Sequence, residues 1–287
     1  MVRCDINLIL TVLVSGNNFF GQLGVDHLKT VYDPVRLNFS FDSQIVEVVA
    51  SQYHTLFLTV KGTVYVAGNN YYSQMSIKDS WVLTPTIVEE LEEIHHIYSG
   101  LRFTIFHTHD GKLLLNGDIE ESNCPVNRFP IYKEDPNDTI RKVSCGDCHF
   151  IILTHSGRVF VYGRNYSGAL GLGHTNDVFD QVIELNYKEI LKTEATIVDV
   201  QCGESHTVFK TREGQIFGCG FNNKHQLIAR KHPQYIIHLH IIPKITDLGI
   251  SKYTKNRVTE VRCGRECTVF LTGKLIKLLV AHVNRQE

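Results

Sequence analysis

The sequence predicts an all-β fold, a β-propeller of about five four-stranded blades that form either a closed ring or an open arc. Three observations favour this fold class. One short sequence recurs along the 287-residue chain, glycines keep a fixed spacing in each copy, and the segments between them alternate apolar and polar residues. A repeat with a period of about 50 residues is typical of propellers and other repeat proteins.

The first element is a predicted strand near residues 11–16. The sequence of residues 11–18, TVLVSGNN, is nearly repeated at 63–70 as TVYVAGNN. The apolar run 6–14 after Arg3 also has the character of a weak signal-peptide core. Its register with the internal copies favours the strand, and no run reaches the ~18 apolar residues of a membrane-spanning helix.

A pair of strands joined by glycine corners comes next in each copy. In residues 198–220, alternation predicts strands at 198–202, 206–211 and 215–219, with Gly203 and Gly214 between them. A histidine stands eight residues before the corner glycine in three copies, at His54, His149 and His206. Phe103 and Cys267 occupy that position in the other two copies. We expect the three histidines to bond the backbone at the blade turns, because every blade must satisfy its own turn.

A glycine-rich signature follows the third strand of each copy. It is GNNFFGQLG at 16–24 and GRNYSGALG at 163–171, and it weakens to GNNYYSQMS at 68–76 and GFNNKHQL at 220–227. The third copy keeps little beyond Gly117. The residues that we assign to the repeat framework are Gly16, Gly21, Gly24, Gly62, Gly68, Gly111, Gly117, Gly146, Gly157, Gly163, Gly168, Gly171, Gly203, Gly214, Gly220, Gly264, His54, His149 and His206.

These positions predict one repeat domain over residues 1–287. Its units lie near 11–60, 61–109, 110–155, 156–212 and 213–273, and an extra strand and a tail follow at 274–287. The combination of Gly-x-Asn-x-x-Gly-x-Leu-Gly, Cys-Gly-x-x-His-Thr and a glycine turn resembles the repeat of the regulator of chromosome condensation family over about residues 11–273. The resemblance implies a β-propeller. Family members usually close seven blades, so five units would be incomplete by comparison.

Two other propeller types are disfavoured. A WD-type repeat would show Trp-Asp pairs, but Trp81 is the one tryptophan of the chain and Val82 follows it. A kelch-type repeat would show paired glycines, and the sequence contains no Gly-Gly.

The sequence offers no catalytic, cofactor-binding or metal-binding residues. Cys145 and Cys148 have the spacing of a zinc or redox pair, but no second pair follows at finger spacing. There is no Gly-x-Ser-x-Gly nucleophile elbow and no phosphate-binding loop ending in Gly-Lys-Ser/Thr. The eight cysteines suit buried apolar positions better than a disulfide scaffold, so a reducing compartment, cytoplasmic or nuclear, is expected.

A protein-interaction scaffold is therefore the favoured function. The net charge of −1 disfavours a protein that coats nucleic acid over its whole surface. Charge is nevertheless uneven: residues 77–121 are acidic and residues 221–257 are basic. The candidate partner-binding residues in these sectors are Glu89, Glu90, Glu92, Glu93, Arg230, Lys231 and Lys244.

The resemblance implies a protein partner, and a small GTPase in particular, because the founding member of the family is a guanine-nucleotide exchange factor for Ran that docks on chromatin. Exchange requires no covalent catalysis. Two alternatives remain: a chromatin or nucleic-acid adaptor acting through residues 221–257, and a degenerate assembly subunit without exchange activity. We expect neither a membrane nor a small-molecule substrate.

Overall fold

The computed structural model describes residues 11–91, 93–122, 125–192, 194–227, 234–241, 258–272 and 277–280. Within these ranges the chain folds into antiparallel sheets, with one helix of five residues. The all-β prediction is confirmed. No helix in the described ranges has both the length and the apolar character that crossing a membrane requires.

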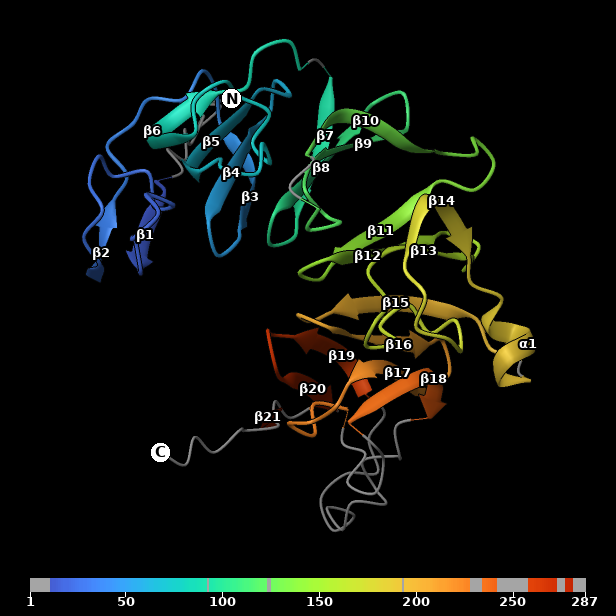
Figure 1. The fold of residues 1–287 in the computed structure, drawn as a ribbon. Coiled ribbons are helices and arrows are strands. Elements are labelled where there is room, and N and C mark those ends of the chain that lie inside the picture. The colour runs from blue at the N-terminus through green and yellow to red at the C-terminus, as the bar shows by residue number, and fades with distance from the viewer. Residues whose placement is uncertain are drawn as a thin grey trace, which may run out of the picture. The chain divides into compact units, whose positions relative to one another are not determined.

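The chain divides into two compact units (Figure 1). Unit 1 comprises residues 1–118 and 123–133, and unit 2 comprises residues 119–122 and 134–287. Each unit is described here by itself.

Unit 1 contains one two-stranded sheet and two four-stranded sheets, whose strand orders are β1-β2, β3-β4-β5-β6 and β7-β8-β9-β10. The strands are β1 (Leu13–Gly16), β2 (Val31–Arg36), β3 (Ile45–Ala50), β4 (His54–Thr59), β5 (Val64–Asn69), β6 (Trp81–Ile87), β7 (Ile94–Ser99), β8 (Phe103–Thr108), β9 (Lys112–Gly117) and β10 (Val126–Lys133).

Unit 2 contains two four-stranded sheets and one three-stranded sheet, whose strand orders are β11-β12-β13-β14, β15-β16-β17-β18 and β19-β20-β21. Its elements are β11 (Ile140–Cys145), β12 (His149–Thr154), β13 (Val159–Gly163), β14 (Val178–Glu184), α1 (Tyr187–Leu191), β15 (Ile197–Cys202), β16 (His206–Thr211), β17 (Ile216–Phe221), β18 (Tyr235–Ile241), β19 (Val258–Cys263), β20 (Thr268–Thr272) and β21 (Lys277–Val280).

The sequence copies and the sheets are out of phase by two strands. The copy near residues 11–60 supplies β1 and β2 to one sheet, and β3 and β4 to the next. A sheet therefore takes its first two strands from one copy and its last two from the following copy. This offset explains why the first described sheet has two strands although its sequence copy is complete.

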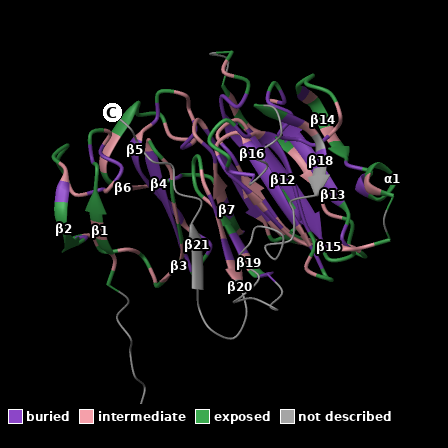
Figure 2. Cartoon of the chain, turned by 90° about the horizontal axis from the view of Figure 1, so that it is seen from below, coloured by how far each residue is buried: buried purple, intermediate pink, exposed green. Residues whose placement is uncertain are grey.

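The core lies between successive sheets of a unit. In unit 1, Leu56 and Val66 from one sheet pack with Ile97 and Phe106 from the next, and all four side chains are inaccessible to solvent. In unit 2, β12 is buried along its whole length (Figure 2). Within the units, β7 packs against β3 and β4, β15 against β11 and β12, and β19 against β15 and β16.

One glycine of the repeat is fixed by this register. His54 pairs with Gly68, Phe103 with Gly117, His149 with Gly163 and His206 with Gly220. A β-carbon at Gly68 would lie 2.3 Å from the carbonyl oxygen of Tyr53, and the φ angle there is +119°. Only glycine fits this close approach at positive φ, which explains why Gly117 persists in the copy that has lost its histidine.

Candidate interaction face of the blade loops

Two kinds of loop lie at the same end of each sheet. One joins the first strand to the second, and the other, which carries the glycine-rich signature, joins the third strand to the fourth. They meet because antiparallel pairing places the start of the second strand beside the end of the third. The loops of unit 1 and those of unit 2 form separate candidate surfaces.

A buried asparagine organises each signature loop. Its side-chain oxygen accepts a hydrogen bond of 2.8–3.0 Å from the backbone N–H five residues later. The four pairs are Asn18 with Leu23, Asn70 with Met75, Asn165 with Leu170, and Asn222 with Leu227. The side-chain amide of Asn70 also donates to the carbonyls of Ile77 and Asp79. Sequence reasoning noted this asparagine but assigned it no role, although its recurrence was the available signal.

The signature glycines allow the loop to pack on the fourth strand of the next sheet. A β-carbon at Gly168 would lie 2.5 Å from the α-carbon of Ile237 on β18. In the second copy, Ser73 and Ser76 replace the glycines and both have a φ angle of +56°. There, Arg128 Nε of β10 donates a hydrogen bond to Ser76 Oγ at 3.1 Å. The second copy thus keeps the loop shape but replaces close packing with polar contacts.

The repeat histidines connect neighbouring sheets. Nε2 of His54, His149 and His206 lies 3.0–3.1 Å from the hydroxyl of Thr104, Thr207 and Thr268 in the next sheet. We expected bonds to the turn backbone, but that backbone is already paired, for example by Gly203 N–H with His206 C=O. Burial lowers the pKa of His54 and His149 to about 3 and that of His206 to about 4.

Both members of this pair are replaced at the same step of the repeat. Phe103 occupies the histidine position of the third copy, and Phe150 occupies the threonine position of the copy that follows. The two residues belong to different units.

The loops of unit 1 expose aromatic side chains. Phe19 and Tyr71 occupy the same signature position and are 62% and 72% exposed. Phe20 packs edge-on against Tyr53, with ring centroids 4.8 Å apart, and lies 6.3 Å from Trp81, which is also exposed. The guanidinium of Arg102 lies 4.3 Å from the ring centroid of Tyr72. We call this set the aromatic loop face; it consists of Phe19, Phe20, Tyr53, Tyr71, Tyr72, Trp81 and Arg102.

The loops of unit 2 carry one exposed aromatic at the same signature position, Tyr166 at 54%, together with paired charges. Arg265 pairs with Glu204, and Arg164 pairs with Glu121 at 2.7 Å. Asp147 N–H donates to the carbonyl of Glu204, whose own N–H donates to the carbonyl of Arg265. Burial and then the charge of Glu204 raise the pKa of Asp147 to about 6, although Arg265 opposes the shift. These contacts join the loops that carry Asp147, Glu204 and Arg265.

The cysteines of the repeat are poor nucleophiles. Burial raises the pKa of Cys202 to about 11, and its thiol donates to the carbonyl of Ser144. Burial also raises the pKa of Cys148 to about 12. Among the described residues, no three His, Cys, Asp or Glu side chains are grouped so that they could hold a metal ion.

The candidate acidic residues lie on the connection between β6 and β7, at the opposite end of the sheets from the aromatic loop face. Glu89 and Glu90 are exposed, and their carbonyls accept hydrogen bonds from Arg128. The carbonyl of Glu93 accepts a hydrogen bond from His109 N–H. Glu92, Arg230, Lys231 and Lys244 lie outside the described residues. The role of these candidates in binding stays a prediction.

The sheets, their register and the asparagine-organised loops define a propeller-type repeat protein. Models of the regulator of chromosome condensation (RCC1) repeat match residues 11–58 and 156–209, and residues 45–74, 140–169 and 197–226. The chain belongs to the RCC1 repeat family.

The relatives of this chain are named for several different activities. It is 25% identical over 239 residues to the Regulator of chromosome condensation of Xenopus laevis, covering 75% of this chain and 55% of the relative. It is 28% identical over 243 residues to the Secretion-regulating guanine nucleotide exchange factor of Mus musculus, covering 77% and 50%. It is 25% identical over 268 residues to the Ultraviolet-B receptor UVR8 of Arabidopsis thaliana, covering 89% and 57%. The chain thus spans about half the length of these relatives.

The solved structure of Prp20p from Saccharomyces cerevisiae, described with its binding to Gsp1p and histones, has the same fold. It superposes with a TM-score of 0.75 and 20% identity, over 88% of this chain and 61% of that one. The sheets of the present chain are therefore blades of the RCC1 propeller type.

Proposed function

We propose that this chain is a protein-interaction module that docks its partner through the aromatic loop face of unit 1. The observation that carries the proposal is the repeated outward aromatic at Phe19 and Tyr71, which are 62% and 72% exposed, on loops fixed by buried asparagines. Exposed aromatic and arginine side chains on rigid supports are the residues that dominate binding energy in protein interfaces.

The rigidity of these loops favours binding. The backbone N–H groups of Phe19 and Tyr71 donate to the side-chain oxygens of Asn17 and Asn69, each at 2.9 Å, so both aromatics project from ordered turns. Gln22 Nε2 donates to the carbonyl of Gln52, which joins the signature loop to a neighbouring loop. A preorganised loop loses little conformational entropy when a partner binds.

We further propose a small GTPase as the partner, with acceleration of nucleotide release as the outcome. The support is the kinship with a relative named as a guanine nucleotide exchange factor. Exchange of this kind needs no nucleophile, because a surface that binds the nucleotide-free GTPase more tightly lowers the barrier to nucleotide loss. Relatives named as a ubiquitin ligase, a protein kinase and a light receptor share the repeat, so the scaffold role is the broader proposal.

The intact chain tests both proposals. Release of a fluorescent guanine nucleotide is measured across a panel of small GTPases, and bound proteins are captured from a nuclear and a cytoplasmic extract. We expect one GTPase to release nucleotide faster and to be captured. Loss of an exposed aromatic hot spot costs about 2 kcal/mol, so a Phe19→Ser, Tyr71→Ser double variant should weaken capture at least ~30-fold.

Val60→Ser is the control, since Val60 is 65% exposed but lies on the turn between β4 and β5, at the opposite end of the sheet from these loops. If release is unchanged across the panel while another protein is captured, the exchange proposal is wrong and the scaffold proposal survives. Capture of histones or nucleic acid with steep salt dependence would favour the adaptor alternative. Equal capture by the double variant and the wild type would refute the aromatic loop face.

A further inference from the structure

Four histidines gather at one end of the sheet β7-β8-β9-β10 in unit 1. His95 and His96 lie at the start of β7, His107 lies near the end of β8, and His109 lies in the turn that follows. The ring centroid of His95 is 4.1 Å from that of His107, 4.6 Å from that of His96 and 5.0 Å from that of His109. We call these four residues the histidine cluster. It lies at the opposite end of the sheet from the aromatic loop face.

A β-bulge brings His95 and His96 together. Neighbouring residues of a regular strand point to opposite faces of the sheet, which would separate these two rings. The pairing of β7 with β8 is irregular between Ile94 and His96, so His95 is an extra residue that breaks the alternation. His96 then pairs across the strands with His107. The bulge thus joins the two adjacent histidines to the histidine of β8.

The repeat does not require histidine at these positions. Leucine occupies the position of His107 in three other sheets, as Leu58, Leu153 and Leu271. Valine occupies the position of His95 in two other sheets, as Val46 and Val198. The fold therefore accepts apolar residues where this sheet has imidazoles. The titratable groups add a property that the repeat itself does not need, and apolar variants at these positions should fold.

His107 is the buried member of the cluster. It is 2% exposed, whereas His95 is half-buried and His96 and His109 are exposed. Burial, and then the charges of His95, His96 and His109, lower the pKa of His107 to about 3. Positive charges a few ångströms apart repel each other, most strongly where water is excluded. The folded cluster therefore resists full protonation.

Neighbouring elements of unit 1 also bring charged or titratable groups to the cluster. They are Glu47 of β3, Tyr98 of β7 itself, Glu93 of the connection between β6 and β7, Asp110 of the turn, Lys112 of β9 and Lys133 of β10. Glu47 Oε2 lies 3.2 Å from His96 Nδ1, and Asp110 is paired with both lysines. β4 also packs on β7, but its His54 bonds Thr104 at the other end of β8. One carboxylate thus contacts four imidazoles directly, too little to offset their full charge.

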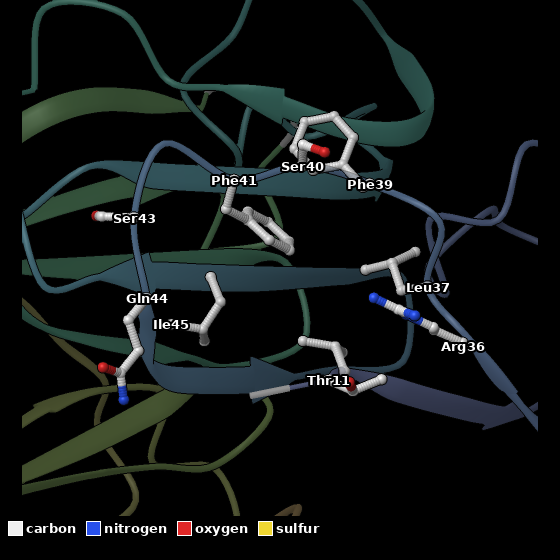
Figure 3. Close-up of a pocket in the computed structure, with 10 residues that line it drawn as sticks. Thr11, Arg36, Leu37, Phe39, Ser40, Phe41, Ser43, Gln44 and Ile45 are labelled. Carbon is white, nitrogen blue, oxygen red and sulfur yellow. The ribbon is translucent and has the colours of Figure 1, made fainter. Parts of the chain in front are cut away.

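The corresponding end of the sheet β3-β4-β5-β6 is built differently. β3 begins at Ile45, as β7 begins at Ile94. Phe41 and Ile45 line a cavity of about 350 Å³ there (Figure 3). The residues that line this cavity include Arg36 but no histidine. Mild acid should therefore act on this end of the sheet β7-β8-β9-β10 and not on the same end of its neighbour.

We propose that the histidine cluster is an acid-sensitive latch, which holds the start of β7 to the end of β8 at neutral pH and releases them as the pH falls towards 5. Neutral imidazoles pack on one another in the closed state. Protonated imidazoles repel, and opening lets each take its proton in water. The N–H of His109 donates to the carbonyl of Glu93, so the connection before β7 is released as well. The latch is separate from the aromatic loop face, so this proposal stands independently of the proposed function.

The direction of the effect follows from His107. Its folded-state pKa, about 3, lies below the unfolded value of about 6.5. Above pH 6.5 the imidazole is neutral in both states, and the closed end has its full stability. As the pH falls from 6.5 towards 3, the opened state takes up a proton that the closed state does not, so opening is favoured. At pH 5 this one proton raises the population of the opened state about 30-fold.

Hydrogen exchange of the intact chain at pH 7.5 and pH 5.0 tests the latch. Protection factors are measured by mass spectrometry and corrected for the effect of pH on intrinsic exchange. In the wild type we expect acid to reduce protection more at residues 93–96 and 107–111 than at residues 99–104, the other end of the same two strands. In a His107→Leu chain the acid-induced loss at residues 93–96 and 107–111 should be about 30-fold smaller. The repeat histidines are present in both chains, so their contribution cancels.

Two further variants separate charge from packing. His107→Gln keeps a polar side chain but cannot titrate, so it should lose the acid response as His107→Leu does. His155→Leu is the matched control, because His155 is an exposed histidine at the turn position that His109 has in unit 1, and its acid response should equal that of the wild type. Equal acid-induced losses in the wild type and both His107 variants would overturn the latch. A uniform loss along β7 and β8 in the wild type would also overturn it, since the release would not be local.

Discussion

At the residue scale, the paired histidine and threonine are the clearest link between sequence and stability. The sequence showed that the histidine recurs, but the partner lies 50–62 residues away and only the fold reveals it. Sequence reasoning therefore assigned His54, His149 and His206 to their own turns. The turn needs no help from the side chain, because its backbone groups pair with each other.

Removing one imidazole should destabilise unit 2. His206→Ala leaves the hydroxyl of Thr268 without its buried partner and creates a cavity, so we expect a loss of about 1–3 kcal/mol in the free energy of unfolding. Denaturant titration measures it. The control is His155→Ala, an exposed position that should change stability by less than ~0.5 kcal/mol. Equal effects of the two variants would contradict this role.

The buried imidazoles should also make the protein sensitive to acid. Their folded-state pKa values, about 3 to 4, lie below the unfolded value of about 6.5. Above pH 6.5 both states are neutral and stability is full. As the pH falls from 6.5 towards 4, the unfolded state takes up protons that the folded state does not, so stability falls. His206→Gln should lower the number of protons taken up on unfolding by about one, and so reduce the slope of the free energy of unfolding against pH. An unchanged slope would be inconsistent with a buried neutral His206.

At the element scale, the signature loop was predictable as a turn but its packing was not. Gly21 and Gly168 read as corner residues from the sequence alone. In the structure they also allow the fourth strand of the next sheet to pack closely against them. The contacting residues are Leu83 and Ile237, which are 62 and 69 positions further along the chain. A contact between different sheets leaves no local pattern in the sequence, so it could not be inferred. The loop asparagines were missed for a related reason, since their hydrogen bonds appear only once the loop is closed.

Two substitutions in equivalent loop positions should have opposite effects. Gly168→Ala places a β-carbon 2.5 Å from the α-carbon of Ile237 at a φ angle of +79°, so we expect a loss of about 2–4 kcal/mol. Ser73→Gly removes a left-handed non-glycine residue, with φ at +56°, and should stabilise by up to about 1 kcal/mol. Differential scanning calorimetry measures the Tm of both variants. A higher Tm for Gly168→Ala would show that the loop does not pack on β18 as described.

At the scale of the whole molecule, the all-β class and the strand positions were predictable because glycine spacing and alternation are local signals. The position of the sheet boundaries within the repeat was not predictable. A repeat can be cut at any point of its period, and the sequence units near 11–60 and 61–109 begin two strands away from the sheet boundaries. Treatment of the two units as one repeat domain stays a prediction.

The two units should respond separately to local damage. His54→Ala weakens a sheet contact within unit 1, and His206→Ala weakens one within unit 2. We expect hydrogen exchange to quicken mainly in the unit that carries the change, because cooperative opening follows contiguous packed regions. Mass spectrometry of peptic fragments measures this, with the wild type as reference. A uniform increase over both units would indicate that they open as one.

The two-strand offset has a consequence for how such a chain changes length. A segment that begins and ends at the same point of the repeat can be duplicated or lost, and every interior strand still has its partner. The two strands left on one side of the junction complete the sheet begun by the two strands on the other side. Each added repeat therefore requires only one new interface between sheets, of the same kind as those already present. Unmatched strands then arise only where an array of repeats begins or ends within its period.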